Sequence, residues 1–116
     1  MKPVANLIHV SDVEQALHWY SSAFPEARIK TVNGFEFLDI NGFALELVPA
    51  DDKVSSGKSG SVTYWEVADL TSAIERFKAL GSSVYRGPID IGLGTGMCQV
   101  TDPFGNLIGL RGRFNP

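Results

Sequence analysis

The sequence carries the same pattern twice, 57 residues apart. Apolar residues at the spacing of one helix face occur at Val13, Ala16, Leu17 and Tyr20, and again at Leu70, Ala73, Ile74 and Phe77. The segment Val-Ser-Asp at 10–12 likewise returns as Val-Ala-Asp at 67–69. Two copies of 57 residues account for 114 of the 116 residues, so we expect an intrachain duplication. Two copies are too few for a stacked repeat array.

The first copy is expected to contain a strand, a helix and a three-stranded meander. A strand at 4–10 leads to Ser11, the expected helix cap, with Glu14 completing a capping box and Pro25 marking the helix end. Strand-like runs follow at 28–32, 35–40 and 43–48, separated by Asn33-Gly34 and Asn41-Gly42. Because a two-residue hairpin turn needs positive φ at both central residues, these Asn-Gly pairs predict hairpins.

The second copy repeats this order after a polar connector at about 51–60. We expect a strand at 61–67 and a helix at 69–80 that ends at Gly81. Further strands are expected near 83–86, 97–101 and 107–111, with a type I turn at Asp102-Pro103-Phe104-Gly105. The predicted fold class is therefore α+β, with one βαβββ module at about 1–50 and another at about 61–114.

Composition and charge exclude several classes of protein. A chain that is 44% hydrophobic and 20% charged is not disordered. Its net charge of −3 and its dispersed Lys and Arg residues argue against nucleic acid as a partner. A single cysteine, Cys98, excludes an internal disulfide and a Cys-rich metal site. No run approaches the ~20 apolar residues of a membrane helix, and no signal peptide is evident, so we expect a cytoplasmic protein without a membrane partner.

Several motifs resemble the vicinal oxygen chelate superfamily, which includes glyoxalase I, bleomycin-resistance proteins and extradiol dioxygenases. The motifs are Val10-Ser11-Asp12-Val13 with Trp19-Tyr20, Tyr64-Trp65-Glu66-Val67-Ala68-Asp69-Leu70, Leu80-Gly81, and Asp102-Pro103-Phe104-Gly105-Asn106-Leu107-Ile108-Gly109-Leu110. The resemblance spans essentially the whole chain. It implies a single domain at 1–116 in which the curved mixed sheets of two βαβββ modules enclose a cavity, with the helices on the outer face.

The resemblance also implies where a catalytic metal would be bound. Metal-dependent members that this chain resembles carry ligands at positions corresponding to Ala5 and Val62 on the first strands, and to Glu46 and Gly109 on the last strands. Only Glu46 has a side chain that can bind a metal. The two histidines, His9 on a strand and His18 on a helix, are not expected to converge on one ion. We therefore expect no cofactor, and a divalent metal is disfavoured.

Strand alternation predicts which side chains line the cavity. Ile8 and Val10, and their counterparts Trp65 and Val67, lead into the apolar helix faces, so they are expected to face the helices. The opposite faces then carry Ala5, Leu7 and His9 in the first module and Val62, Tyr64 and Glu66 in the second. We expect His9, Tyr64 and Glu66 to line one cavity, with Leu7 beside them, and the resemblance adds Glu46 to the same cavity.

Each candidate also has a structural interpretation. His9 and Glu66 are polar ligand contacts or hydrated strand-end residues, and Tyr64 lines the pocket or packs in the core. Arg111 either binds an anionic group through two parallel N–H donors or is a solvated arginine at the strand end. Residues 92–96, Gly-Leu-Gly-Thr-Gly, lack the Lys-Ser or Lys-Thr pair of a phosphate loop and are expected to form a mobile loop over the cavity mouth.

Two classes of function follow from the sequence. The first is a protein similar to the bleomycin-resistance branch that binds a small organic molecule in a cavity between its modules, without a catalytic metal. The alternative is a glyoxalase- or dioxygenase-type enzyme that uses Glu46 as its catalytic carboxylate, with or without a divalent metal. In either class we expect a homodimer, because pairing covers exposed strand edges.

Overall fold

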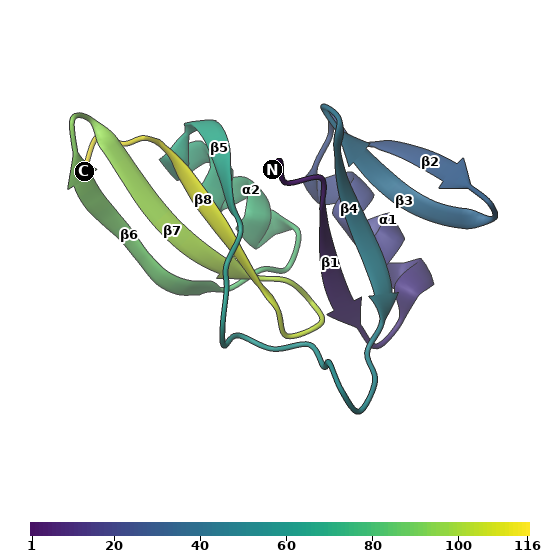
Figure 1. The fold of residues 1–116 in the computed structure, drawn as a ribbon. Coiled ribbons are helices and arrows are strands. Elements are labelled where there is room, and N and C mark those ends of the chain that lie inside the picture. Colours follow the sequence, from purple (N-terminus) through teal and green to yellow (C-terminus); the bar gives the residue numbers. More distant parts are fainter. The chain divides into compact units, whose positions relative to one another are not determined.

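The first compact unit, Met1–Ser56, is one βαβββ module (Figure 1). The computed structural model describes all residues from 1 to 116. The elements of this unit are β1 (Ala5–Val10), α1 (Val13–Ala23), β2 (Arg28–Val32), β3 (Phe35–Ile40) and β4 (Phe43–Pro49). Its sheet has the order β1-β4-β3-β2, in which β1 pairs parallel with β4 and the other pairs are antiparallel. The first strand of the module thus lies beside its last.

Both Asn-Gly pairs form the hairpin turns that the sequence predicts. Asn33 and Gly34 have φ of 50° and 78°, and Asn41 and Gly42 have φ of 52° and 89°. Positive φ at both central residues is the geometry that matches the twist of two adjoining antiparallel strands. These turns fix the order of β2, β3 and β4.

The prediction that Ser11 and Glu14 form a capping box at the start of α1 is wrong. The cap is Asp12, whose carboxylate accepts a 3.0 Å hydrogen bond from the backbone N–H of Gln15. Asp69 caps the second helix in the same way, through the backbone N–H of Ser72 at 3.0 Å. Aspartate is as good a cap as serine and adds a negative charge at the positive end of the helix.

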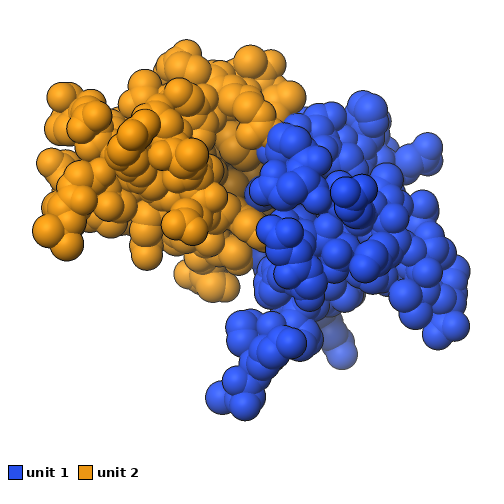
Figure 2. Space-filling view, turned by 90° about the horizontal axis from the view of Figure 1, so that it is seen from above, with its two compact units in different colours: residues 1–56 blue, residues 57–116 orange.

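The second unit, Gly57–Pro116 (orange in Figure 2), is another βαβββ module with the same topology (Figure 1). Its elements are β5 (Tyr64–Asp69), α2 (Leu70–Ala79), β6 (Val84–Gly92), β7 (Thr95–Thr101) and β8 (Leu107–Arg113). The strand order is β5-β8-β7-β6, again with the first strand parallel to the last. Gly81, with φ of 94°, follows α2 as predicted. Val62 precedes β5 rather than lying on it, so its expected place on a strand is wrong.

In each unit the helix covers one face of the sheet, and the apolar core lies between them. In β4, Leu45 and Leu47 are buried, whereas Glu46 between them points to the opposite face. The register places Ile8 beside Leu47, and Trp65 beside Leu110, which is also buried. Ile8 and Trp65 thus lie on the helix side, as alternation predicts. Below, "open face" means the face of each sheet away from its helix. Neither helix is long and apolar enough to cross a membrane.

A buried aspartate organises the turn between β7 and β8. Asp102 is 5% exposed, and its Oδ1 accepts hydrogen bonds of 2.8 Å from the backbone N–H groups of both Phe104 and Asn106. Its Oδ2 accepts a further bond of 3.1 Å from the Asn106 amide. Asn106 in turn accepts a 2.9 Å bond from the backbone N–H of Gly57. Asp102 therefore fixes the turn that enters β8.

We predict that Asp102→Ala destabilises the protein by roughly 1–3 kcal/mol, because it leaves the partly buried N–H groups of Phe104 and Asn106 without acceptors. Urea unfolding followed by circular dichroism measures this change. Asp52→Ala is the control, since Asp52 is exposed and makes no hydrogen bond or ion pair. Equal stabilities for the two variants would contradict the role assigned to Asp102.

Candidate functional site

Four polar or aromatic side chains share the open face of the second sheet. The register pairs Tyr64 with Gly109 and Glu66 with Arg111 across β5 and β8. It also pairs Gln99 with Gly109 across β7 and β8. Residues paired in register point to the same face. Tyr64, Glu66, Gln99 and Arg111 therefore lie together on the face away from α2, while Ile108 and Leu110 are buried on the other side.

The ring of Tyr64 lies directly over Gly109. A Cβ atom built on Gly109 would come within 2.6 Å of two ring atoms of Tyr64, closer than any real contact. The Tyr64 hydroxyl oxygen accepts a 2.9 Å hydrogen bond from Nε2 of Gln99. The ring can therefore lie flat across β8 only because position 109 has no side chain.

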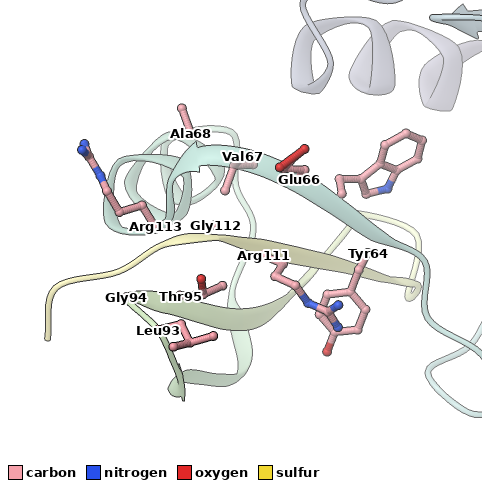
Figure 3. Close-up of a pocket in the computed structure, with 11 residues that line it drawn as sticks. Tyr64, Glu66, Val67, Ala68, Leu93, Gly94, Thr95, Arg111, Gly112 and Arg113 are labelled. Carbon is pink, nitrogen blue, oxygen red and sulfur yellow. The ribbon is translucent and has the colours of Figure 1, made fainter.

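Arg111 holds its guanidinium over the same ring. Its Cζ atom is 4.9 Å from the centre of the Tyr64 ring, within the range of a cation–π interaction (Figure 3). Ion pairs form between Lys30 and Asp39, between Glu75 and Lys78 and between Asp69 and Arg113, whereas Arg111 takes part in none. The neighbouring carboxylate of Glu66 is thus not paired with it. Arg111 therefore contacts an aromatic ring but has no carboxylate partner in the protein.

A hollow of about 590 Å³ lies beside these residues, within the second unit. It is lined by residues 64–68 of β5, by residues 111–113 of β8 and by residues 93–95 at the β6–β7 turn (Figure 3). Arg113 at its rim lies 3.9 Å from the carboxylate of Asp69. The pKa of Asp69 is lowered, first by the hydrogen bond from the Ser72 backbone and to a lesser degree by Arg113. The rim arginine is therefore already paired with an anion.

The mobile loop expected over residues 92–96 is, in the structure, confined to a tight turn between two strands. Gly92 ends β6, Thr95 begins β7, and the two residues pair in the ladder. Leu93 and Gly94 between them form a two-residue turn with φ of 55° and 73°. Positive φ at both positions suits a tight hairpin, so the glycines serve the turn. The Leu93 side chain is fully exposed where it lines the hollow.

The remaining candidates lie on the open face of the first sheet. Leu7 pairs in register with Glu46, and His9 pairs with Val48. Glu46 is partly buried and makes no hydrogen bond or ion pair. His9 lies near Asp51, whose pKa is lowered mainly by backbone hydrogen bonds from Val54 and Lys53 and in small part by His9. The structure thus brings His9, Leu7 and Glu46 onto one face of β1 and β4.

The residues at the metal-ligand positions do not fit a metal ion. Ala5 and Gly109 carry no donor group, and Val62 lies outside the sheet. The ring of Tyr64 covers Gly109. No group of three or more His, Cys, Asp or Glu side chains occurs that could hold an ion. Glu46 alone is not a metal site.

Sequence reasoning missed Gln99 and Arg113. Gln99 is a polar residue between Cys98 and Val100, both buried, so alternation along β7 could have placed it on the open face. Its contact with Tyr64 depends on which strands are neighbours and could not have been inferred.

Cys98 is buried in a strand as expected, and burial raises the pKa of its thiol.

We predict that Gly109→Ala destabilises the protein by about 1–3 kcal/mol, because the new methyl group forces the Tyr64 ring to move. The cost should largely disappear in a Tyr64→Ala background and persist in a Tyr64→Phe background, which keeps the ring. Denaturant unfolding of the single and double variants gives the coupling energy. The same cost in all three backgrounds would show that the ring does not rest on residue 109.

Comparison with known proteins agrees with this fold. A family model described as Glyoxalase/Bleomycin resistance protein/Dioxygenase superfamily matches residues 3–110. No protein of curated function matches the sequence. A glyoxalase-related enzyme from Fulvimarina pelagi aligns with a TM-score of 0.77 at 18% identity, covering 97% of this chain and 88% of that one.

Two further solved structures share the fold at lower identity. A glyoxalase/bleomycin resistance protein/dioxygenase family enzyme from Burkholderia phytofirmans has a TM-score of 0.78 at 13% identity, covering 98% of this chain and 100% of that one. A virulence protein from Salmonella typhimurium has a TM-score of 0.71 at 14% identity, covering 98% of each chain. The two βαβββ modules and the family match over nearly the whole sequence lead to one assignment: the chain belongs to the glyoxalase/bleomycin resistance protein/dioxygenase superfamily.

Proposed function

We propose that this protein binds a small organic molecule on the open face of its second sheet and does so without a catalytic metal. The observation that carries the proposal is the contact between Tyr64 and Gly109. An aromatic ring occupies the place where the resemblance implies a metal-binding side chain. That ring, with Arg111 and Gln99, offers a surface suited to an organic ligand.

The size and lining of the hollow support binding. About 590 Å³ lies within the range of 300–1,000 Å³ typical of pockets for small molecules. Its lining combines an aromatic ring, a cation and the exposed side chain of Leu93, so it offers polar and apolar contacts. A protein of this kind acts by sequestration, since holding the ligand is sufficient.

The experiment that tests this proposal is a thermal-shift screen of organic compounds, with metal analysis of protein purified without chelators. We expect a ligand at 100 times its dissociation constant to stabilise the fold by about 2.7 kcal/mol. Tyr64→Ala should abolish that shift, whereas Phe35→Ala, which removes an exposed aromatic ring from β3 of the first unit and not from the hollow, should not. One tightly bound divalent ion per chain, lost together with an activity, would contradict the proposal.

One observation favours an enzyme as the second candidate. Glu46 is partly buried between Leu45 and Leu47 and has no hydrogen-bond or ion-pair partner, and His9 lies on the same face of the sheet. An unpartnered carboxylate on an apolar strand is the kind of group that serves as a general base. If the protein is an enzyme, Glu46→Gln should abolish turnover with little change in melting temperature. Full activity in that variant would remove Glu46 from the chemistry.

We also propose that the protein is a homodimer. The strand β6 is an edge of its sheet, and Tyr85, Ile89 and Ile91 are all at least 40% exposed along it. Exposed apolar side chains on a strand edge favour association with a second chain. Light scattering should therefore give twice the mass of one chain, and Ile89→Lys with Ile91→Lys should shift the protein toward monomer. Monomer alone across a wide concentration range would contradict this.

A further inference from the structure

We infer that Arg111 and Tyr64 form a carboxylate-binding site, so that the ligand of this protein is a small organic acid. The inference rests on the proposed binding function and names the class of ligand. It depends on two groups of hydrogen-bond donors that meet at one place on the open face of the second sheet and that no protein acceptor uses.

The first group of donors belongs to Arg111. A guanidinium carries five N–H donors and no acceptor. The side chain of Arg111 makes one interaction, the contact of its guanidinium with the Tyr64 ring, in which Cζ lies 4.9 Å from the ring centre. This contact is not a hydrogen bond, so the N–H donors of Arg111 have no protein acceptor. The contact also restrains the side chain, which reduces the entropy lost when a ligand binds.

Arg113 provides the contrast within the same hollow. Both arginines are exposed and line it, but the guanidinium of Arg113 lies 3.9 Å from the carboxylate of Asp69. Arg111 has Glu66 opposite it in register on β5, yet no ion pair forms between them. Arg113 therefore has a carboxylate partner within the protein, whereas Arg111 has none.

The second donor is the hydroxyl of Tyr64. Its oxygen accepts the hydrogen bond from Gln99 Nε2, so its own O–H points elsewhere. No protein group accepts that proton. Tyr64 is partly buried, and a ligand that covers its O–H must supply an acceptor to replace water. Gln99 is therefore the positioning residue for this hydroxyl.

A carboxylate matches these donors better than other common groups. It is planar, and its two oxygens accept the parallel N–H groups of a guanidinium at the same time. The hydroxyl of Tyr64 can donate to a remaining lone pair. The apolar part of such a ligand has the exposed side chain of Leu93 in the same hollow. A neutral amide of the same shape would present an NH₂ donor to Arg111 and leave one N–H unpaired.

The test compares benzoate with benzamide, which has the same size and shape but no charge. NMR titration of the ¹⁵N-labelled full chain gives both dissociation constants and reports whether the Nε–H signal of Arg111 moves. We expect benzoate to bind at least about tenfold more tightly than benzamide, because a hydrogen bond to a charged group is the stronger kind.

Substitutions identify the side chains that bind the carboxylate of benzoate. Arg111→Gln should weaken benzoate binding about tenfold or more and leave benzamide binding within about twofold. Tyr64→Phe, which keeps the ring and removes the donor, should weaken benzoate binding by roughly fivefold. Arg113→Gln is the matched control, since it removes an equal charge from the same hollow, and it should change benzoate binding by less than about threefold. A larger loss in Arg113→Gln than in Arg111→Gln would overturn the inference.

Other outcomes separate this inference from the proposed function. Equal binding of benzoate and benzamide would overturn the carboxylate site but leave a binding protein. Tighter binding of phenylphosphonate than of benzoate would also overturn it, since the site would then select tetrahedral anions. If neither probe binds at millimolar concentration, the inference fails, and the proposed function is judged separately by the thermal-shift screen.

Discussion

The parallel pairing of β5 with β8 is the contact on which the second unit depends. It joins the first and last strands of the module, and it brings Tyr64 beside Gly109 and Glu66 beside Arg111. The absence of a side chain at Gly109 lets the Tyr64 ring lie across β8, and the ring in turn supports the guanidinium of Arg111 and the amide of Gln99. The contacts of Tyr64 with Gly109 and Arg111 follow from this pairing, and its hydrogen bond with Gln99 also requires the pairing of β7 with β8.

The two modules carry different residues at this pairing. In the first, Leu7 lies beside Glu46, and in the second Tyr64 lies beside Gly109. The first module has a carboxylate next to an exposed aliphatic side chain, whereas the second has a glycine next to an aromatic ring. An ion would need donors from several such positions, and Glu46 is the one that remains.

Much of the fold was predictable from local chemistry. The Asn-Gly turns, the glycine after α2 and the 57-residue repeat gave two βαβββ modules and the phase of their strands, because turns and alternation act over a few residues. The errors were local too. The cap of α1 is Asp12 rather than Ser11, and the loop expected over residues 92–96 is confined to the two-residue turn at Leu93 and Gly94. The first error arose because Ser11 and Asp12 are neighbours and both are good helix caps.

The candidate site was predictable only in part. The sequence by itself determined that Tyr64 and Glu66 share a face, and that His9 and Leu7 share another, because side chains alternate along a strand. Only the tertiary structure decided that Gln99 holds the Tyr64 hydroxyl and that Arg113 has an anion whereas Arg111 has none. Those contacts depend on the register between strands that are far apart in the sequence, and a shift of one residue would have turned each side chain to the opposite face.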